Sequence, residues 1–403
     1  MNPLIIRSPQ VFREKQNIDA RVHHRVTAID LQKRAVRAEN LETGKTMEER
    51  FDYLLIATGA SPILPKIPGL SARGIHTLGT LQSGIAVREA VDQQNPRRVV
   101  LVGAGYIGLE MAENFTHRGI QVAIVEQAPQ VMSTIDPDLA ALLADELAKR
   151  GVQLFLEESL RGFELEGGEV RAVITDRRAL PADLAVMGLG VRPNSQLARD
   201  AGISMGETGG IKVNEKMQTE TAGVWAAGNC AEAFHLVSRR PVAFALGTVA
   251  NKQGRVAGIN IAGGQAVFPG VVGTAMVKVF DWEVARTGLQ EREAMQAGIS
   301  SASVKIEGRT RAGYYPGAGK IFVKIIFEPG NGRLLGGQIV GHEGAGKRID
   351  VLATALHAGM TVEEMINLDL GYSPPFSPAW DPLLIACRQA AGQLCLRNSK
   401  QKT

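Results

Sequence analysis

A glycine-rich stretch between an apolar run and a helical pattern is the part of this sequence best suited to hold a ligand. It reads GAGYIG at residues 103–108, after a β-branched run at 98–102, and a second β-branched run ends on Glu126. Gly103 permits a tight turn, Gly105 lets backbone approach a pyrophosphate, and Gly108 lets the helix pack closely on the strand. The helix N-terminus also offers free N–H groups to phosphates. The pattern predicts a dinucleotide half-site, the alternative being an ordinary glycine turn.

Glu126 bears on which dinucleotide binds. A carboxylate at this place accepts hydrogen bonds from ribose hydroxyls and repels a 2′-phosphate. The following residues 127–132, QAPQVM, contain no Arg or Lys that would accept such a phosphate. We therefore expect NADH rather than NADPH. The residues predicted to bind it are Gly103, Gly105, Tyr106, Ile107, Gly108, Glu126 and Gly190.

Two further apolar runs end on glycine without a full fingerprint. They read LLIATG at residues 54–59 and VWAAGN at residues 224–229. Both bring bare backbone to the carboxyl end of a strand, where ligands bind in open α/β sheets. The candidate binding residues here are Thr58, Gly59, Gly228 and Asn229.

The elements that must position these residues follow from periodicity and turn signals. A helix is expected from Pro9, with Ser8 as its N-cap. Further helical patterns cover residues 138–150, 243–262, 347–358 and 361–367. Strands are expected at residues 20–29, 35–41, 51–57, 152–156, 172–175, 184–189, 211–214, 275–280, 301–307, 320–327 and 334–340. Residues 268–270 read as a linker to a separate C-terminal α+β domain.

Composition limits the function classes. A chain of 403 residues is expected to form two or three domains, and its net charge of +4 is spread out, which argues against nucleic acid as a partner. No apolar run is long enough to span a membrane. Three cysteines, Cys230, Cys387 and Cys395, form neither a disulfide framework nor a CxxC motif, and no metal-ligand spacing is visible. We expect a cytoplasmic protein in which these cysteines have structural roles.

The ATG stretch at residues 57–59, GAGYIGLE at 103–110 and AAGNCAE at 226–232, in this order and spacing, resemble the flavin-dependent pyridine nucleotide-disulfide oxidoreductases. The resemblance covers nearly the whole chain. It implies an α/β fold in which a Rossmann-like NAD domain is inserted in a partial FAD-binding Rossmann-like domain, followed by a C-terminal α+β dimerisation domain. The implied boundaries are 1–93 and 211–267 for the FAD domain, 94–210 for the NAD(P)H domain, 268–396 for the dimerisation domain and 397–403 for a tail.

The resemblance also implies site residues. Thr58, Gly59, Gly228 and Asn229 would hold FAD, and Glu110 resembles a glutamate near the flavin ring, the alternative being a solvated helix carboxylate. The family usually has Asp where this chain has Asn229, which still accepts a hydrogen bond but carries no charge. The family's first βαβ unit, with its FAD fingerprint and redox cysteine, would precede the segment that opens this sequence. We find neither here.

The C-terminal segment is similar to the group of coenzyme A-disulfide reductases, NADH oxidases and persulfide reductases. The resemblance lies in GYYPG at residues 313–317, QIVGHEG at 338–344, KRIDVLA at 347–353 and LDLGYSPPFS at 368–377. In coenzyme A-disulfide reductases, tyrosines of this domain reach the partner's active site in a homodimer, and Tyr372 with Tyr314 or Tyr315 match them. A neutral tyrosine hydroxyl can donate to a developing thiolate. The alternative is packing at the dimer interface.

Three functions follow as expectations. The first is an FAD- and NADH-dependent homodimeric oxidoreductase that reduces a small-molecule disulfide or persulfide such as coenzyme A disulfide. The second keeps both cofactors and sends electrons to oxygen or a quinone. The third is a truncated dimeric chain that binds NADH and catalyses nothing alone.

Overall fold

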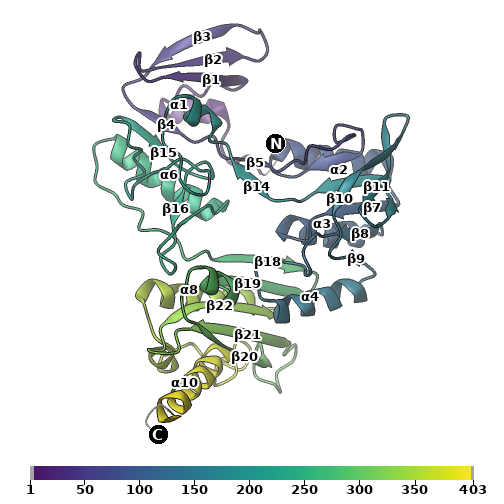
Figure 1. Cartoon of the computed structure of the whole chain (residues 1–403), viewed down its shortest axis with the longest axis vertical. Helices are drawn as coiled ribbons and strands as arrows, with labels where there is room; N and C mark the ends of the chain where they lie inside the picture. The colour runs from purple at the N-terminus through teal and green to yellow at the C-terminus, as the bar shows by residue number, and fades with distance from the viewer. Residues whose placement is uncertain (1–3, 401–403) are drawn as a thin grey trace. The chain divides into compact units, whose positions relative to one another are not determined.

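The structure is a computed structural model that describes residues 4–400, with side chains described through Leu396. It divides into two compact units, whose helices and strands are labelled in Figure 1. Unit 1 contains the residues up to 60 together with 193–233 and 241–268, and unit 2 contains the remainder. The chain therefore leaves unit 1, builds residues 61–192 in unit 2, and returns. This order agrees with the predicted insertion of one α/β domain in another.

The first part of unit 2 is a five-stranded parallel sheet in the order β6-β13-β7-β8-β9. Its strands are β6 (Ile75–Thr77), β7 (Arg98–Val102), β8 (Gln121–Val125), β9 (Gln153–Phe155) and β13 (Leu184–Met187). Near-continuous apolar runs suit such strands because both faces are buried.

Alternate residues of β7 show what covers each face. Val99 and Leu101 pack against a helical layer. Its members are α2 (Leu81–Gln94), α3 (Tyr106–His117) and α4 (Pro137–Lys149). Val100 and Val102 pack against a second, antiparallel sheet. That sheet consists of β10 (Leu160–Glu166), β11 (Glu169–Thr175) and β12 (Ala179–Pro181). The nucleotide fingerprint thus starts from a rigid central strand.

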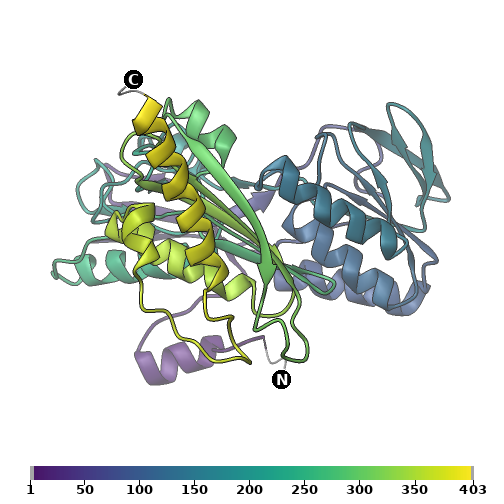
Figure 2. The ribbon, with the colours of Figure 1, turned by 90° about the horizontal axis from the view of Figure 1, so that it is seen from below.

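The second part of unit 2 is a five-stranded antiparallel sheet in the order β18-β19-β22-β21-β20, called the C-terminal sheet below. Its strands are β18 (Ala275–Val279), β19 (Trp282–Gly288), β20 (Ala302–Arg309), β21 (Lys320–Phe327) and β22 (Leu334–Gly341). Four helices and one 3₁₀ turn accompany it: α7 (Glu291–Gln296), η1 (Gly346–Arg348), α8 (Ile349–Ala358), α9 (Val362–Ile366) and α10 (Pro382–Lys400). Figure 2 shows α10 along this sheet, and its side chains Leu383, Cys387 and Leu394 join the sheet's core.

Unit 1 has a small parallel pair, β4 (Leu54–Ile56) with β15 (Val224–Ala226), and an antiparallel meander of β1 (His24–Asp30), β2 (Ala35–Asn40) and β3 (Thr46–Arg50). Its helices are α1 (Pro9–Gln16), α5 (Gln196–Asp200) and α6 (Gly247–Ile261). Two short sheets lie where the chain changes unit, β5 (Ala60–Pro62) with β14 (Val191–Pro193) and β16 (Ala233–Phe234) with β17 (Pro241–Val242). Ser8 caps α1 as predicted, since its hydroxyl accepts from the Val11 N–H.

Several sequence-based elements need correction. The strand expected at 211–214 is wrong, because Ile211 makes only isolated bridges to Met205 and Ala231. The strand expected at 20–29 begins at His24, since His23 has a positive φ of 55° that breaks the extended run. The elements that were not predicted include helix α2 and strands β3, β10 and β19. The backbone of α10 continues through Lys400, across part of the expected tail 397–403, whose residues 401–403 lie outside the described range.

Candidate functional site

The fingerprint glycines lie at the carboxyl end of β7. Gly103 has φ +106°, and a Cβ there would lie 2.4 Å from the carbonyl oxygen of Gly188, at the end of β13. A Cβ on Gly108 would lie 2.0 Å from the carbonyl oxygen of Gly103. Both contacts are far shorter than van der Waals distances. Glycine is therefore required for strand and helix to approach this closely.

The N-terminus of α3 has the properties of an anion site. Gly105 is its N-cap and provides no side-chain hydrogen bond to the first turn, which begins with Tyr106 and Ile107. A Cβ built on Gly105 would meet nothing within 4 Å, so the space in front of it is open. Uncapped N–H groups and the positive end of the helix dipole favour a phosphate at this point.

The carboxylate of Glu126 closes the fingerprint from the end of β8. It accepts hydrogen bonds from the Ala104 N–H at 2.7 Å and from the Ala128 N–H at 2.8 Å. Each carboxylate oxygen has further acceptor capacity, so ribose hydroxyls can still donate to it. Gly190, also predicted for this site, lies beyond the end of β13 and has φ +85°. Its carbonyl accepts a hydrogen bond from the Ile63 N–H at 2.9 Å.

The glycine-ended strands β4 and β15 of unit 1 pair in parallel, so their carboxyl ends lie side by side. After β4, the Thr58 hydroxyl donates to the Asn194 carbonyl at 2.6 Å, and the Asn194 amide donates to the Thr58 carbonyl at 2.9 Å. The Asn194 N–H donates to the carbonyl of Gly59. Thr58 and Gly59 are therefore held by a residue that the sequence analysis did not select.

After β15, the turn at Gly228 and Asn229 is held by Gln253 of α6. The Gly228 N–H donates to Oε1 of Gln253 at 2.8 Å, and Nε2 of Gln253 donates to the Glu232 carbonyl at 3.2 Å. Among the residues that the structure describes, Oδ1 of Asn229 is buried and has no hydrogen-bond partner. A buried acceptor without a donor is costly unless a ligand supplies one. The turn therefore fits a hydroxyl-bearing group such as the flavin ribityl chain.

The three candidate tyrosines lie in two loops of unit 2. Tyr314 is 78% exposed and Tyr372 is 54% exposed. An interaction with the side chain of Tyr372 is the largest cause that raises the pKa of Tyr314. Tyr315 is partly exposed, and its N–H donates to the Ala312 carbonyl at 2.8 Å. The structure thus brings Tyr314 and Tyr372 together.

Arg348 holds the two tyrosine loops in place. Its guanidinium donates to the carbonyls of Thr310 at 2.7 Å and Phe376 at 3.0 Å, and to the Asp381 carboxylate at 2.9 Å. Asp381 in turn accepts from the Ser377 hydroxyl at 3.0 Å. A planar five-donor group is suited to joining several acceptors in this way. Arg348 lies in the KRIDVLA stretch at residues 347–353, but the sequence analysis did not select it for this role.

Glu110 lies on α3, one turn before Asn114, whose amide donates to the Glu110 carbonyl. Partial burial, and then the nearby Glu113 carboxylate, raise the pKa of Glu110. A carboxyl group with a raised pKa next to a nucleotide site is a candidate for function, and a helix surface carboxylate is the alternative.

The cysteines are all free. Cys230 is fully buried, in agreement with a structural role, and burial raises the pKa of Cys387 to about 12. Cys395 is exposed on α10 and does not pack in the core, contrary to the expectation of a structural role. Neither buried thiol has the electropositive, accessible surroundings of a reactive cysteine.

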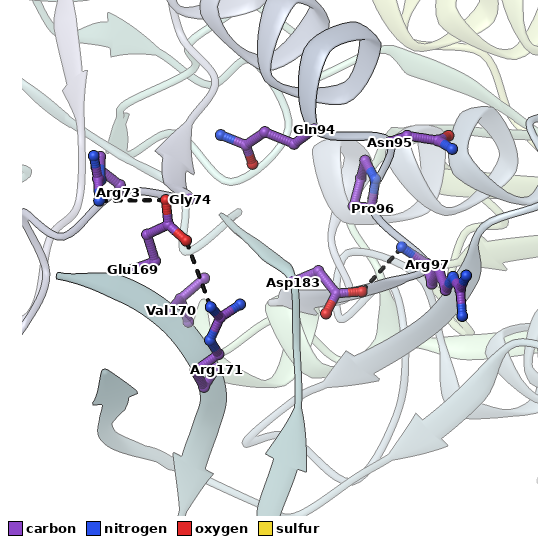
Figure 3. A pocket seen from close by; sticks show the side chains of 10 residues that line it. All are labelled: Arg73, Gly74, Gln94, Asn95, Pro96, Arg97, Glu169, Val170, Arg171 and Asp183. Carbon is purple, nitrogen blue, oxygen red and sulfur yellow. Dashed lines mark hydrogen bonds and ion pairs between the residues drawn. The ribbon is translucent and has the colours of Figure 1, made fainter. Parts of the chain in front are cut away.

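A cavity of about 320 Å³, whose lining residues are drawn in Figure 3, lies at the amino ends of strands of the parallel sheet, whereas the fingerprint lies at a carboxyl end. The lining residues Gly74, Arg97 and Asp183 directly precede β6, β7 and β13, respectively. The cavity therefore opens at the amino ends of these strands. Glu169 pairs there with Arg73 at 3.3 Å and with Arg171 at 3.6 Å. Ligands of such sheets bind at the carboxyl ends, and this cavity is not the nucleotide site.

Within residues 4–400, no helix has the length and apolarity needed to cross a membrane. The described part of the chain also contains no cluster of three or more His, Cys, Asp or Glu side chains arranged to hold a metal ion.

Comparison with known proteins places this geometry in a family context. The model for pyridine nucleotide-disulphide oxidoreductases matches residues 3–257, and the model for the dimerisation domain of these enzymes matches residues 274–383. A protein from Pyrococcus horikoshii named NAD(P)H coenzyme A polysulfide/persulfide reductase is 39% identical over 382 residues, covering 94% of this chain and 84% of that protein. A protein from Methanocaldococcus jannaschii named NADH oxidase is 36% identical, covering 97% of this chain and 87% of that protein.

Among solved structures, an NAD-dependent persulfide reductase from A. fulgidus superposes with a TM-score of 0.92 at 38% identity. The superposition covers 96% of this chain and 71% of that one. The predicted α/β architecture with a C-terminal dimerisation domain is thereby confirmed. The predicted domain boundaries and site residues stay predictions.

Proposed function

The chain belongs to the pyridine nucleotide-disulphide oxidoreductases, and from this membership we propose that it is an NADH- and FAD-dependent enzyme that reduces a disulfide or persulfide of the coenzyme A type. The family is FAD- and NAD(P)H-dependent, and the chain is an oxidoreductase of that kind. The preference for NADH, the acceptor and the assembly as a homodimer are the proposed parts.

The observation that carries the proposal is the fingerprint closed by Glu126. Gly103 and Gly108 leave no room for side chains, the N-terminus of α3 is uncapped with open space in front of Gly105, and the carboxylate of Glu126 lies beside Ala104. A dinucleotide diphosphate matches the helix N-terminus, and unmodified ribose hydroxyls match the carboxylate. A 2′-phosphate would meet that negative charge, which favours NADH.

FAD would be held in unit 1 by Thr58 and Gly59 after β4 and by Gly228 and Asn229 after β15. Support comes from the buried, partnerless Oδ1 of Asn229 and from the turn geometry that Gln253 maintains. The chemistry that FAD supplies when bound is two-electron transfer between nicotinamide and acceptor.

The tyrosine pair supports a thiol-forming acceptor reaction. One NADH and one proton convert one disulfide into two thiols and NAD⁺, so a thiolate must leave and be stabilised. The hydroxyl of Tyr314 is protonated at neutral pH, because the pKa of a tyrosine is ordinarily about 10 and that of Tyr314 is raised, so it can donate to such a thiolate. Because both tyrosines are exposed in the dimerisation domain, we propose that they serve the site of a second copy.

Oxygen as the acceptor is the second candidate. It is favoured by the relative from Methanocaldococcus jannaschii that is named NADH oxidase. This reaction needs neither tyrosine hydroxyl.

The test uses the purified full chain with added FAD. We expect flavin absorbance that persists after gel filtration, elution at the mass of a dimer, and NADH oxidation without air that depends on coenzyme A disulfide. Tyr372→Phe is expected to lower this turnover about tenfold or more, whereas Tyr53→Phe, a matched change in unit 1, leaves it unchanged. NADH consumption only under air would replace the proposal by the oxidase. If the protein binds NADH but retains no flavin and shows no turnover, the result would support the third expected function, a chain that binds NADH and catalyses nothing alone.

A further inference from the structure

The segment between β8 and α4, residues 126–136, is called the strap here, and it contacts the fingerprint at several points. Its first residue, Glu126, accepts from the Ala104 N–H, and the Met132 N–H donates to the Ala104 carbonyl at 2.9 Å. Both backbone polar groups of Ala104, its N–H and its carbonyl, are therefore bonded to the strap. Farther along, the Thr134 hydroxyl lies 3.4 Å from the hydroxyl of Tyr106. The strap thus determines how the fingerprint backbone is oriented.

The far end of the strap is held by side chains of the C-terminal sheet. Gln338 of β22 exchanges two hydrogen bonds with Asp136: its Oε1 accepts from the Asp136 N–H at 2.6 Å, and its Nε2 donates to the carboxylate at 2.8 Å. Lys324 of β21 pairs with the same carboxylate at 3.0 Å. Arg286 of β19 donates to the Thr134 carbonyl at 2.8 Å. Three neighbouring strands therefore converge on the last residues of the strap.

These contacts are buried and charged, which bears on their role. Asp136 is 2% exposed, Lys324 is 5% exposed and Arg286 is 4% exposed. Arg286 is itself fixed by Glu293 at 2.6 Å, and Lys324 also reaches Asp138 at 3.0 Å. Buried ion pairs add little stability compared with apolar packing, but they allow one arrangement and penalise others. Such a network is suited to fixing the position of a segment.

We propose that Lys324, Gln338 and Arg286 are positioning residues for the nucleotide half-site: the C-terminal sheet sets the strap, and the strap sets Ala104, Tyr106 and Glu126 for NADH. The inference rests on the proposed use of NADH. It extends the nucleotide site beyond the parallel sheet that carries the fingerprint. The dimerisation domain then contributes to dinucleotide affinity as well as to assembly.

The test measures binding of ADP-ribose, which occupies the half-site without undergoing reaction, to the FAD-loaded full chain. Lys324→Met is expected to raise the Kd for ADP-ribose and the KM for NADH about tenfold, with kcat at saturating NADH within about twofold. Thr134→Val keeps every charge and the carbonyl bond to Arg286, and removes only the hydroxyl next to Tyr106. It is expected to raise the Kd about threefold with an unchanged melting temperature.

Asp281→Asn is the matched control. It removes the ion pair between Arg150 of α4 and Asp281 after β18, which also joins the two parts of unit 2 but lies off the strap. Its Kd is expected to equal that of the wild type. If Lys324→Met folds poorly, the inference is tested by comparing the Kd for ADP-ribose of Thr134→Val with that of Asp281→Asn. Wild-type affinity for ADP-ribose in folded Thr134→Val and Lys324→Met would overturn this inference and leave the proposed function unaffected. Absence of ADP-ribose and NADH binding in the wild type would overturn the proposed function as well.

Discussion

Glu126 and Ala104 lie 22 residues apart in the sequence, yet Oε2 of Glu126 accepts a 2.7 Å hydrogen bond from the Ala104 N–H. The carboxylate is therefore anchored to the fingerprint itself. Its second oxygen is anchored by Ala128. A negative charge fixed in this way cannot turn aside to admit another anion. This relationship gives the site its expected selectivity for an unphosphorylated ribose.

Glu126→Gln should weaken that selectivity. The amide keeps one acceptor and loses the charge that repels a 2′-phosphate, so the ratio of kcat/KM for NADH to that for NADPH should fall about tenfold, or ~1.4 kcal/mol. Steady-state kinetics with both nucleotides measures the ratio. Glu164→Gln, an exposed change on β10, serves as the control. An unchanged ratio in Glu126→Gln would show that selectivity comes from elsewhere.

Two glycine substitutions should separate folding from binding. Gly103→Ala places a methyl group 2.4 Å from the Gly188 carbonyl at φ +106°, and we expect destabilisation by about 2 kcal/mol or more and loss of NADH binding. Gly105→Ala meets no atom within 4 Å, so stability should hold within about 0.5 kcal/mol. Its methyl group should still obstruct a diphosphate and weaken binding. Urea unfolding and ADP-ribose titration test both, and tight binding by Gly105→Ala would argue against a diphosphate at the α3 N-terminus.

The parts of the fold that were predictable are those whose evidence is local in the sequence. The fingerprint glycines, the Ser8 cap and strand β21 follow from short patterns in which neighbouring residues agree. Strand β19 was missed because Glu283 and Arg286 interrupt its apolar pattern. In the structure Arg286 is buried and forms an ion pair with Glu293, a partner that no local sequence pattern predicts.

The site residues that were missed act at long range for the same reason. Gln253 contacts Gly228, 25 positions earlier, and Asn194 contacts Thr58, 136 positions earlier. The sequence around a glutamine in an alanine- and glycine-rich helix does not indicate which loop its side chain will contact. Conversely, Tyr314 and Tyr372 were selected only through a resemblance. The interaction between their side chains depends on two loops that are joined by a hydrogen bond from the Ala312 N–H to the Pro374 carbonyl.

Arg348→Met should disturb those loops. It removes the donors to the Thr310 and Phe376 carbonyls and leaves Asp381 without its cation, and we expect destabilisation by about 3 kcal/mol. Turnover with coenzyme A disulfide should fall in the protein that remains folded, whereas its ADP-ribose affinity should be unchanged. Lys347→Met, which removes an exposed pair with Asp350, is the control and should change stability by less than about 0.5 kcal/mol. Equal turnover in Arg348→Met and Lys347→Met would contradict a positioning role.

His235 should make stability depend on pH in the mildly acidic range. The ring is 2% exposed, and burial lowers the pKa of His235 from 6.5 to about 4, with the Arg286 charge acting in the same direction and Glu293 opposing it. Because the folded pKa lies below the unfolded one, the folded state binds this proton less readily. The stability due to the neutral ring is therefore present above pH 6.5 and is lost as the pH falls toward 4. A difference of this size corresponds to roughly 3 kcal/mol over the whole range.

His235→Asn should flatten this pH dependence. Nδ1 of His235 accepts from the Ser238 N–H at 3.2 Å, and an asparagine oxygen can replace that acceptor without adding a group that titrates. The free energy of unfolding, measured in urea between about pH 7 and pH 5, should fall less steeply in His235→Asn than in the wild type. His357→Asn changes an exposed histidine of α8 and should leave the wild-type slope in place. Carboxyl groups with lowered pKa values, such as Asp138 and Asp183, titrate below this interval, so a common slope in all three proteins would exclude His235 as its source.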